Sequence, residues 1–301
     1  MPTARPLPPV IAGGPFTVRA ALGLGVSAGE LRRATLTSPF WGVREQTTGP
    51  DDVVARCRAA LQVLPDGAVF SHVTALRLRE IEVPWSLERD NLLHVVVPTR
   101  SGRPQRPQIR AHVSGRIDPA RSPICGLAVT SPAQTWLHLA AALDLGELVV
   151  LGDAMLRRKL PPTTWGALED AAAASSGARG VRTARLALPL LRSGTDSSME
   201  SRARLVLVHA GLPCPEVNTP VLDAWGRFVA LPDLSYPELR IAIEYDGDVH
   251  RTDARTWRRD IARREALQAL GWRIITLTAD DVIRFPTRMV SWVRAAINAR
   301  A

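Results

Sequence analysis

The sequence contains a single lysine, three cysteines and no long hydrophobic run. Lys159 stands alone among 38 basic residues, so arginine carries almost all of the positive charge. The cysteines are far apart and form no Cys-x-x-Cys or Cys/His motif, so neither a disulfide framework nor a cysteine zinc site is indicated. No stretch of 18 apolar residues occurs, and residues 1–15 lack the pattern of a signal peptide. A cytoplasmic location without a membrane partner is therefore expected.

The chain is strongly basic, with a net charge of +9 and a pI near 10.8. Such a charge favours a polyanionic partner such as nucleic acid. A GC-rich genome also replaces lysine by arginine in any protein, so the charge alone leaves DNA binding open. From Met199 onward lie 15 of the 38 basic and 13 of the 29 acidic residues, which gives this part a charge of +2 and the preceding part +7.

Residues 16–50 have the spacing of a helix-turn-helix unit. Residues 16–24 predict a short helix, and Ser27-Ala28-Gly29-Glu30 has the pattern of a capping box that opens a second helix. Residues 40–44 predict a strand or wing, as a winged helix requires. The alternative is a small helical hairpin with a solvated arginine face. In a winged helix, three arginines could contact DNA phosphates: Arg32, Arg33 and Arg44.

Residues 51–175 predict a mixed α/β region, and residues 176–197 predict a linker region. The linker prediction rests on two stretches rich in serine and glycine, with the domain boundary near residue 195. The histidines are far from one another in sequence, so each is expected to be capped or packed rather than to bind a metal. They are His72, His94, His112, His138 and His209.

Residues 198–298 predict a domain with the order helix, three strands, helix, strand. The first helix starts at Ser198 and carries Glu200 in its first turn, and Gly211 and Pro213 end it. The strands are expected over residues 217–222, 228–233 and 240–246 and form a β-meander. A helix over 255–270 and a strand over 272–278 follow.

The last hairpin of this meander is expected to bring carboxylates together. A loop centred between Glu238 and Leu239 gives opposed residues a constant sum of 477, which pairs Asp233 with Glu244. Because side chains alternate along a strand, Glu244 and Asp246 share one face. Three carboxylates, those of Asp233, Glu244 and Asp246, are therefore predicted to converge.

Like charges at close range are costly unless a cation or protons compensate them. Hard oxygen ligands suit Mg²⁺ or Mn²⁺, which can support phosphodiester hydrolysis. His250 follows Asp246 by four residues and is a candidate general acid or base. The alternatives are solvated acids on an exposed sheet face and a solvated histidine at a helix entry. Candidate phosphate contacts on the following helix, which could equally be a solvated face of mixed charge, are Arg255, Arg258 and Arg259.

The segment Asp233-Leu-Ser-Tyr-Pro-Glu-Leu-Arg-Ile-Ala-Ile-Glu-Tyr-Asp-Gly-Asp-Val-His250, preceded by Glu200 in a helix, resembles the Vsr-like branch of the PD-(D/E)XK endonuclease superfamily. The resemblance implies a restriction-endonuclease-like αβββαβ core. It implies that Asp233 and Glu244 bind the metal and that Glu200 supports the metal or its waters. Asp246 stands where the superfamily motif has lysine, a position for which His250 or Arg259 could substitute.

The N-terminal region, with its helix-turn-helix spacing, resembles the AbiEi-type antitoxin domains of toxin-antitoxin systems. The resemblance rests on Phe40-Trp-Gly-Val-Arg44, Phe70-Ser-His-Val-Thr-Ala75 and Val129-Thr-Ser-Pro-Ala-Gln-Thr-Trp136. It implies a DNA-binding winged helix before the nuclease-type domain, and a partner protein of a toxin-antitoxin or defence system.

Two functions therefore remain open. One is a Mg²⁺-dependent DNA endonuclease or nickase with an N-terminal DNA-binding module. The other is a non-catalytic DNA-binding regulator of toxin-antitoxin type that uses a degenerate nuclease fold, which the missing motif lysine favours. No feature of the sequence separates a DNA substrate from an RNA substrate.

Overall fold

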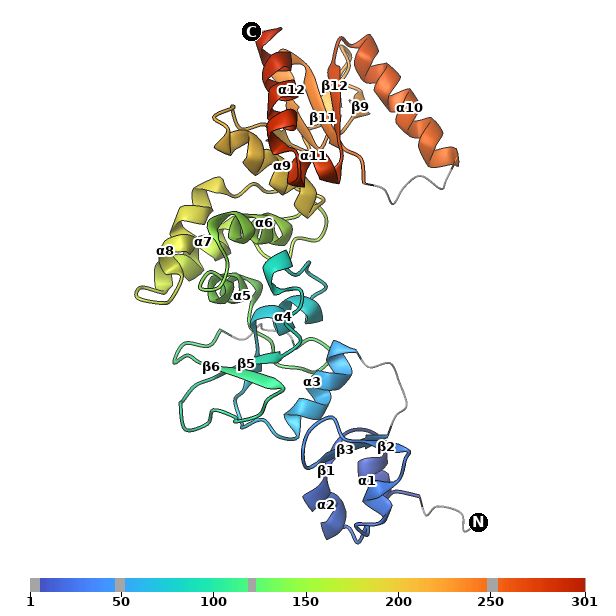
Figure 1. Cartoon of the computed structure of the whole chain (residues 1–301), viewed down its shortest axis with the longest axis vertical. Helices are drawn as coiled ribbons and strands as arrows, with labels where there is room; N and C mark the ends of the chain where they lie inside the picture. Colours follow the sequence, from blue (N-terminus) through green and yellow to red (C-terminus); the bar gives the residue numbers. More distant parts are fainter. Residues whose placement is uncertain (1–5, 47–51, 119–122, 248–253, 301) are drawn as a thin grey trace. The chain divides into compact units, whose positions relative to one another are not determined.

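A computed structural model describes residues 6–46, 52–118, 123–247 and 254–300, with the backbone alone for residues 254–260. The protein is a mixed α/β structure with small sheets (Figure 1). It divides into two compact units, residues 1–138 and 139–301. The mixed α/β class predicted from the sequence is therefore confirmed.

The first unit begins with a small three-stranded sheet in the order β1-β3-β2. Its elements are α1 (Pro9–Ala12), β1 (Phe16–Thr17), α2 (Val18–Gly23), the 3-10 turn η1 (Glu30–Arg32), β2 (Leu36–Thr37) and β3 (Val43–Gln46). The predicted first helix starts two residues late, because Phe16 and Thr17 pair with β3. The predicted wing is present as β3, which starts at Val43 rather than at Phe40.

The predicted second helix of the helix-turn-helix is only the single turn η1. Its capping box forms, since the Glu30 N–H donates to Ser27 Oγ at 3.2 Å and Glu30 accepts from the Ser27 N–H at 2.8 Å. The turn does not grow into a helix. The Arg44 guanidinium donates a hydrogen bond to the Leu31 carbonyl at 3.0 Å, an acceptor that the next helical turn would use. Leu36 then pairs with Gln46 in the sheet.

The rest of the first unit is built on a sheet in the order β4-β5-β6. Its elements are α3 (Val53–Leu61), β4 (Val69–Phe70), α4 (His72–Leu78), the 3-10 turn η2 (Trp85–Leu87), β5 (Leu93–Val97), β6 (Ile109–Val113) and α5 (Pro132–Leu139). Strands β5 and β6 are parallel, and β4 is antiparallel to β5. Between β6 and α5 the described residues form isolated bridges, one of which joins Phe70 to Val129.

Of the helices that open the second unit, only the last was expected to belong to the C-terminal domain. They are α6 (Leu145–Met155), α7 (Trp165–Ala174), α8 (Val181–Ala187), the 3-10 turn η3 (Leu188–Leu190) and α9 (Ser198–His209). The expected linker over 176–197 thus contains a helix with buried alanines. The buried pair Arg204–Asp153, at 2.6 Å, fastens α9 to α6, and Ser201 donates to the same carboxylate. This pairing of distant residues is why the predicted boundary near residue 195 differs from the structure.

The sheet of the second unit has the order β12-β11-β10-β7. Its strands are β7 (Glu216–Val217), β10 (Leu234–Tyr236), β11 (Ile241–Tyr245) and β12 (Arg273–Leu277), and β11 and β12 run parallel. The predicted three-stranded meander is wrong in detail. The strand expected over 217–222 breaks at Asn218 to Pro220, and β8 (Val221–Leu222) pairs with β9 (Phe228–Ala230) in a separate hairpin. Ser235 and Tyr236 are strand residues rather than loop.

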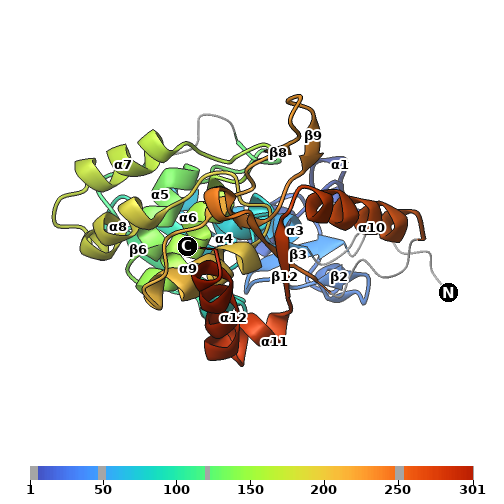
Figure 2. The same ribbon diagram turned by 90° about the horizontal axis from the view of Figure 1, so that it is seen from above.

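Helices cover both faces of this sheet (Figures 1 and 2). On one face, α9 and α12 (Pro286–Asn298) pack against Leu234, Ile241 and Ile243. On the other face, α10 (Ala254–Ala269) packs over Ala242 through Leu267. The remaining helix, α11 (Ala279–Ile283), precedes α12, which begins at Pro286. The sheet of the second unit therefore lies between two helical layers, with Glu244 on the α10 side and Glu200 on α9, which packs on the other face.

Candidate active site

The hairpin that carries the acidic residues has the predicted register. Leu234 pairs with Ile243 and Tyr236 with Ile241, so opposed residues sum to 477. Continuing this register by one position places Asp233 opposite Glu244. The turn between the strands is the 3-10 turn η4 (Pro237–Leu239), after which Arg240 adopts a left-handed conformation. The predicted register is confirmed for Leu234 to Tyr236, and by extension it sets the two acids opposite each other.

Glu244 is a buried acid near the end of β11, only 4% exposed. Strand alternation sends Ile241 and Ile243 into the core under α9 and α12, which leaves Glu244 facing α10. Neither carboxylate oxygen has a hydrogen-bond partner among the described residues. Two guanidinium groups on α10 lie nearby, with Arg263 at 3.2 Å and Arg264 at 3.7 Å. These are charge contacts without hydrogen-bond geometry, so both oxygens keep their capacity to bind a cation.

Asp233 ends the loop before β10 and is half-buried. Burial, together with the nearby charges of Glu200 and Glu244, raises the pKa of Asp233 from 3.8 to about 7. A hydrogen bond from the Tyr245 N–H at 2.7 Å and the charge of Arg263 oppose the rise in pKa. Asp233 is therefore held among acids and changes its protonation near neutral pH.

Glu200 lies in the first turn of α9, as predicted, and is buried. Its carboxylate accepts hydrogen bonds from the Asp196 N–H at 3.0 Å, the Ser197 hydroxyl at 2.8 Å and Asn218 at 2.9 Å. Burial raises the pKa of Glu200 in spite of these donors. The acid thus caps the helix and ties it to the segment after β7, and its charge acts on Asp233 from that position.

Asp246 does not join the buried acids. It lies one residue beyond β11, its side chain is exposed, and its backbone N–H donates to the Leu277 carbonyl at 2.7 Å. The prediction that it shares the face of Glu244 placed it within the strand, whereas the strand ends at Tyr245. His250 lies outside the described residues. Arg255, Arg258 and Arg259 lie on α10, where the backbone alone is described.

The residues present are suited to a hard divalent cation at the position between Asp233 and Glu244. Two buried oxygens of Glu244 have no hydrogen bond among the described residues, and one oxygen of Asp233 is bound by a backbone N–H. All of these are carboxylate oxygens, the ligand type that Mg²⁺ and Mn²⁺ take in proteins. Glu200 is the least available of the three acids because its oxygens already accept three hydrogen bonds.

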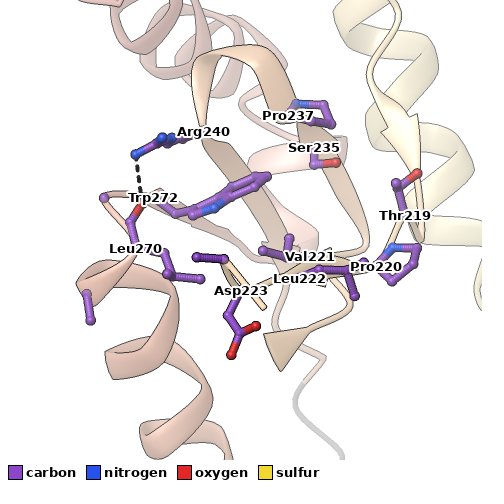
Figure 3. A pocket seen from close by; sticks show the side chains of 13 residues that line it. Thr219, Pro220, Val221, Leu222, Asp223, Ser235, Pro237, Arg240, Leu270 and Trp272 are labelled. Atoms are coloured by element: carbon purple, nitrogen blue, oxygen red, sulfur yellow. Dashed lines mark hydrogen bonds between the residues drawn. The ribbon is translucent and has the colours of Figure 1, made fainter. Parts of the chain in front are cut away.

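A cavity of about 750 Å³ opens on the α10 side of the sheet (Figure 3). The β8–β9 hairpin, Ser235, Arg240 and Trp272 line it, and the Trp272 ring lies across its middle. Arg240 donates to the Leu270 carbonyl at 3.1 Å on its rim. None of the predicted acids lines this cavity. Ser235 follows Asp233 by two residues and so lies on the same sheet face, which makes the cavity a neighbour of the acidic site.

The three N-terminal arginines that were candidate phosphate contacts differ in their exposure and in the contacts that they already make within the fold. Arg44 is occupied within the fold, donating to Leu31, Ser38 and Val43. Arg33 pairs with Glu30 at 2.9 Å. Arg32 is exposed and uses its Nε to reach the Ala28 carbonyl at 3.2 Å. Arg44 therefore holds the turn η1 in place, and Arg32 has the most exposed guanidinium of the three.

Four histidines that were expected to be isolated lie together in the first unit. The rings of His72 and His112 stack with centroids 3.7 Å apart, and His138 stacks on His72 at 4.9 Å. His94 Nδ1 lies 3.1 Å from His112 Nε2. Among the described residues, His72, His94 and His112 are the one group of three or more His, Cys, Asp or Glu whose ligand atoms all lie within 4.8 Å of one another. The acids of the second unit are less tightly grouped than these histidines.

The expectation of isolated histidines was wrong because the pairing of β5 with β6 is non-local. In each strand the odd-numbered residues are apolar and the histidine is at an even position, a pattern that does place both histidines on one face once the strands pair. His72 and His138 come from helices whose positions the sequence does not show.

Comparison with known proteins gives a family without a described activity. The chain is 32% identical over 234 residues to the uncharacterized protein Rv2248 of Mycobacterium tuberculosis strain H37Rv, an alignment that covers 77% of this chain and 83% of that protein. The uncharacterized protein MT2308 of strain CDC 1551 matches over the same length with the same identity. The chain belongs to the family of these mycobacterial proteins. Their names state no substrate or partner.

No family model matches the chain. No solved structure matches it either. Within the described residues, no helix is long and apolar enough to cross a membrane. The function of the family is therefore inferred from the geometry of the site.

Proposed function

We propose that the second unit is a divalent-cation-dependent nuclease that hydrolyses phosphodiester bonds, with DNA as the substrate, and that its core is of the restriction-endonuclease-like αβββαβ type. The observation that carries the proposal is the burial of Asp233 and Glu244 side by side, with Glu200 close enough to raise the pKa of Asp233. Like charges that are buried together destabilise a fold. Such groups are typical of functional sites, where a bound cation compensates their charge.

Asp233 and Glu244 would hold the cation, Mg²⁺ or Mn²⁺, and Glu200 would support them from α9. When bound, the cation supplies charge neutralisation at the phosphate and a more acidic water for attack. Glu200 orients the site indirectly, because its hydrogen bond from Asn218 fixes the segment that leads into the sheet. Asp233, with a pKa of about 7, can exchange a proton with its surroundings at neutral pH.

Arg263 and Arg264 support a phosphate substrate. Both guanidinium groups lie beside Glu244 and are partly exposed on α10, so they can reach a bound phosphodiester without a large movement. Arginine binds phosphate oxygens through charge-assisted hydrogen bonds, which fix the orientation of the scissile group. They contribute positive charge next to the site, a role that the sequence suggested for neighbouring arginines of the same helix.

The β8–β9 hairpin supports a nucleic-acid substrate in particular. Its tip exposes Trp225 (78%) and Phe228 (65%), and the Arg227 guanidinium lies 4.8 Å from the centroid of the Trp225 ring. Exposed aromatic rings beside arginine can stack on nucleic-acid bases and contact the backbone. The same hairpin lines the cavity next to the acidic site.

A second function is favoured by one observation. The guanidinium groups of Arg263 and Arg264 already compensate the charge of Glu244 without a metal, and Asp246 replaces the motif lysine. This arrangement would suit a non-catalytic DNA-binding regulator with a degenerate nuclease fold, in which the acids serve stability alone. The two functions predict different outcomes in a cleavage experiment.

The test is incubation of the full-length protein with supercoiled plasmid in Mg²⁺, in Mn²⁺ and in EDTA. We expect nicking with either cation and none in EDTA. Asp233→Asn and Glu244→Gln remove the charges and keep the side-chain sizes, and each should slow nicking by about 100-fold or more, since altering even an outer support of a metal ligand costs roughly 10- to 100-fold. Glu238→Gln is the matched control, since Glu238 is exposed on the same hairpin. A parallel reaction with RNA decides the substrate class.

Nicking that survives in both charge-removing variants would refute the site. Absence of nicking with every cation, together with salt-sensitive DNA binding by the wild type, would establish the regulator instead. Melting temperatures of the variants separate loss of activity from loss of folding.

A further inference from the structure

The histidine cluster of the first unit is built by four separate elements. His94 is on β5 and His112 on β6, and the parallel register, which pairs Val96 with His112, puts both side chains on the face away from Leu93, Val95, Ile109 and Ala111. His72 begins α4 and His138 lies at the end of α5. The sheet and two helices thus bring four imidazoles to one place, although they are up to 66 residues apart in the sequence.

Hydrogen bonds fix which nitrogen of each ring is free. Asp90 binds His94 Nε2 at 3.1 Å, which leaves His94 Nδ1 facing His112 Nε2. Asp90 is itself held by Arg110 at 2.8 Å and by the Leu92 N–H at 3.1 Å. Ser71 Oγ binds His72 Nδ1 at 2.9 Å, which leaves His72 Nε2. A carboxylate on the far nitrogen of a histidine is the usual outer support of a metal-binding imidazole, because it fixes the tautomer and orients the ring.

The imidazoles are neutral at physiological pH. Burial lowers the pKa values of His112 and His138 to about 4, and it lowers the pKa values of His72 and His94 as well. A neutral ring offers a nitrogen lone pair without a competing proton. The Nδ1 atom of His138 is buried and has no hydrogen-bond partner among the described residues. A fourth nitrogen that could bind a metal therefore lies beside the other three histidines.

We propose that His72, His94 and His112 bind a transition-metal ion of the zinc class, which cross-links α4, β5 and β6. The 3.1 Å between His94 Nδ1 and His112 Nε2 is close to the separation of two ligands in a tetrahedral site with metal–nitrogen bonds of about 2.0–2.1 Å. Imidazole ligands suit Zn²⁺, Co²⁺, Ni²⁺ and Cu²⁺ and disfavour Mg²⁺. The site is thus distinct in ligand chemistry from the acidic site of the second unit.

Binding needs one ring to tilt. The rings of His72 and His112 are nearly parallel, with an interplanar angle of 13°, so their lone pairs do not yet converge on one point. Rotation of His72 about its second side-chain torsion, which is broad for histidine, brings Nε2 toward the other two nitrogens. The proton that His112 Nε2 shares with His94 Nδ1 moves to His112 Nδ1, a change of tautomer that keeps the ring neutral and leaves both facing lone pairs for the metal. Because His72 and His94 are buried, the ion serves to stabilise the first unit.

The test uses full-length protein without a polyhistidine tag, stripped with EDTA and transferred to chelator-free buffer. Co²⁺ titration should give the intense visible absorption of a tetrahedral site, saturating at one equivalent, and Zn²⁺ should displace it. Zn²⁺ should also raise the melting temperature of the wild type by mass action. The proposal would be overturned if the wild type bound no Co²⁺ and its melting temperature did not change on addition of Zn²⁺, whatever the variants do.

Variants assign the ligands. His94→Gln and His112→Gln should abolish the absorption, and His72→Asn should do so at a position with φ of 50°, which asparagine tolerates. Asp90→Asn should weaken binding by roughly 10- to 100-fold, as expected for an outer support. His209→Gln is the matched control, since His209 is exposed on α9. The acidic-site variant Asp233→Asn should bind Co²⁺ like the wild type. Equal binding in His94→Gln and His209→Gln would overturn the assignment.

Discussion

The sharpest quantitative expectation concerns Asp233→Asn, which should stabilise the protein while it abolishes the proposed activity. Burial and the charges of Glu200 and Glu244 raise the pKa of Asp233 from 3.8 to about 7. The folded protein therefore holds a proton that the unfolded chain releases between these two pH values. The unfolding free energy falls as pH rises through this window, and the full cost of the ionised carboxylate is present above pH 7.

The magnitude follows from the two pKa values. Their difference corresponds to about 4 kcal/mol at 1.36 kcal/mol for each tenfold change in proton affinity. The amide of asparagine carries no charge and still offers an oxygen to the Tyr245 N–H, although a neutral acceptor binds it less strongly than a carboxylate does. We expect Asp233→Asn to be more stable than the wild type by about 2–4 kcal/mol at pH 8, with the advantage shrinking by more than half at pH 5.

Differential scanning calorimetry in EDTA measures this effect without a bound cation. For a unit of this size the expected gain corresponds to a rise of roughly 4–16 °C in the melting temperature at pH 8. Glu238→Gln, at an exposed position of the same hairpin, should leave the melting temperature unchanged. Equal melting temperatures of wild type and Asp233→Asn at pH 8, or a wild type that gains stability from pH 5 to pH 8 while the variant does not, would refute the reasoning.

Two further expectations concern the frame around the site. Arg204→Met leaves Asp153 buried without its ion-pair partner, since Arg204 lies 2.6 Å from it, and should lower the unfolding free energy by about 3–5 kcal/mol in urea titrations. A result within 1 kcal/mol of wild type, roughly the value of an exposed ion pair, would contradict the role given to this pair. Gly180→Ala should be more destabilising than Gly177→Ala, although both glycines have φ of 79°, because a side chain at 180 would meet the Ala140 carbonyl carbon at 2.3 Å. Only the conformational cost of about 1–2 kcal/mol applies at Gly177, and equal losses in the two variants would show that the close approach is absent.

The hairpin of the candidate site could be predicted because its information is local. Alternation of apolar residues fixed which face Glu244 occupies, and the turn around Pro237 fixed the register with Asp233. The end of the strand was less predictable: Asp246 falls one residue outside it, although its backbone N–H still donates to the Leu277 carbonyl on β12. The approach of Arg263 to Glu244 depends on how α10 packs on the sheet, which no local pattern encodes.

The histidine cluster shows the opposite case. His94 and His112 become neighbours only through the parallel pairing of β5 with β6, which are joined by residues 98–108. His72 enters the group at the start of α4, and nothing in the sequence predicts where that helix packs. The helix-turn-helix prediction failed for a related reason, since Leu36 and Thr37, soon after the single turn η1, pair with Gln46 and Glu45 in the sheet.

The central claim is that Asp233 and Glu244 form a divalent-cation site, and Mn²⁺ binding followed by electron paramagnetic resonance tests it most directly. Free Mn²⁺ is titrated with wild type, Glu244→Gln and Glu238→Gln at pH 8, where Asp233 is ionised. We expect wild type and Glu238→Gln to remove one equivalent of free Mn²⁺, and Glu244→Gln to remove none with comparable affinity. Equal uptake by wild type and Glu244→Gln, or no uptake by either, would contradict the claim.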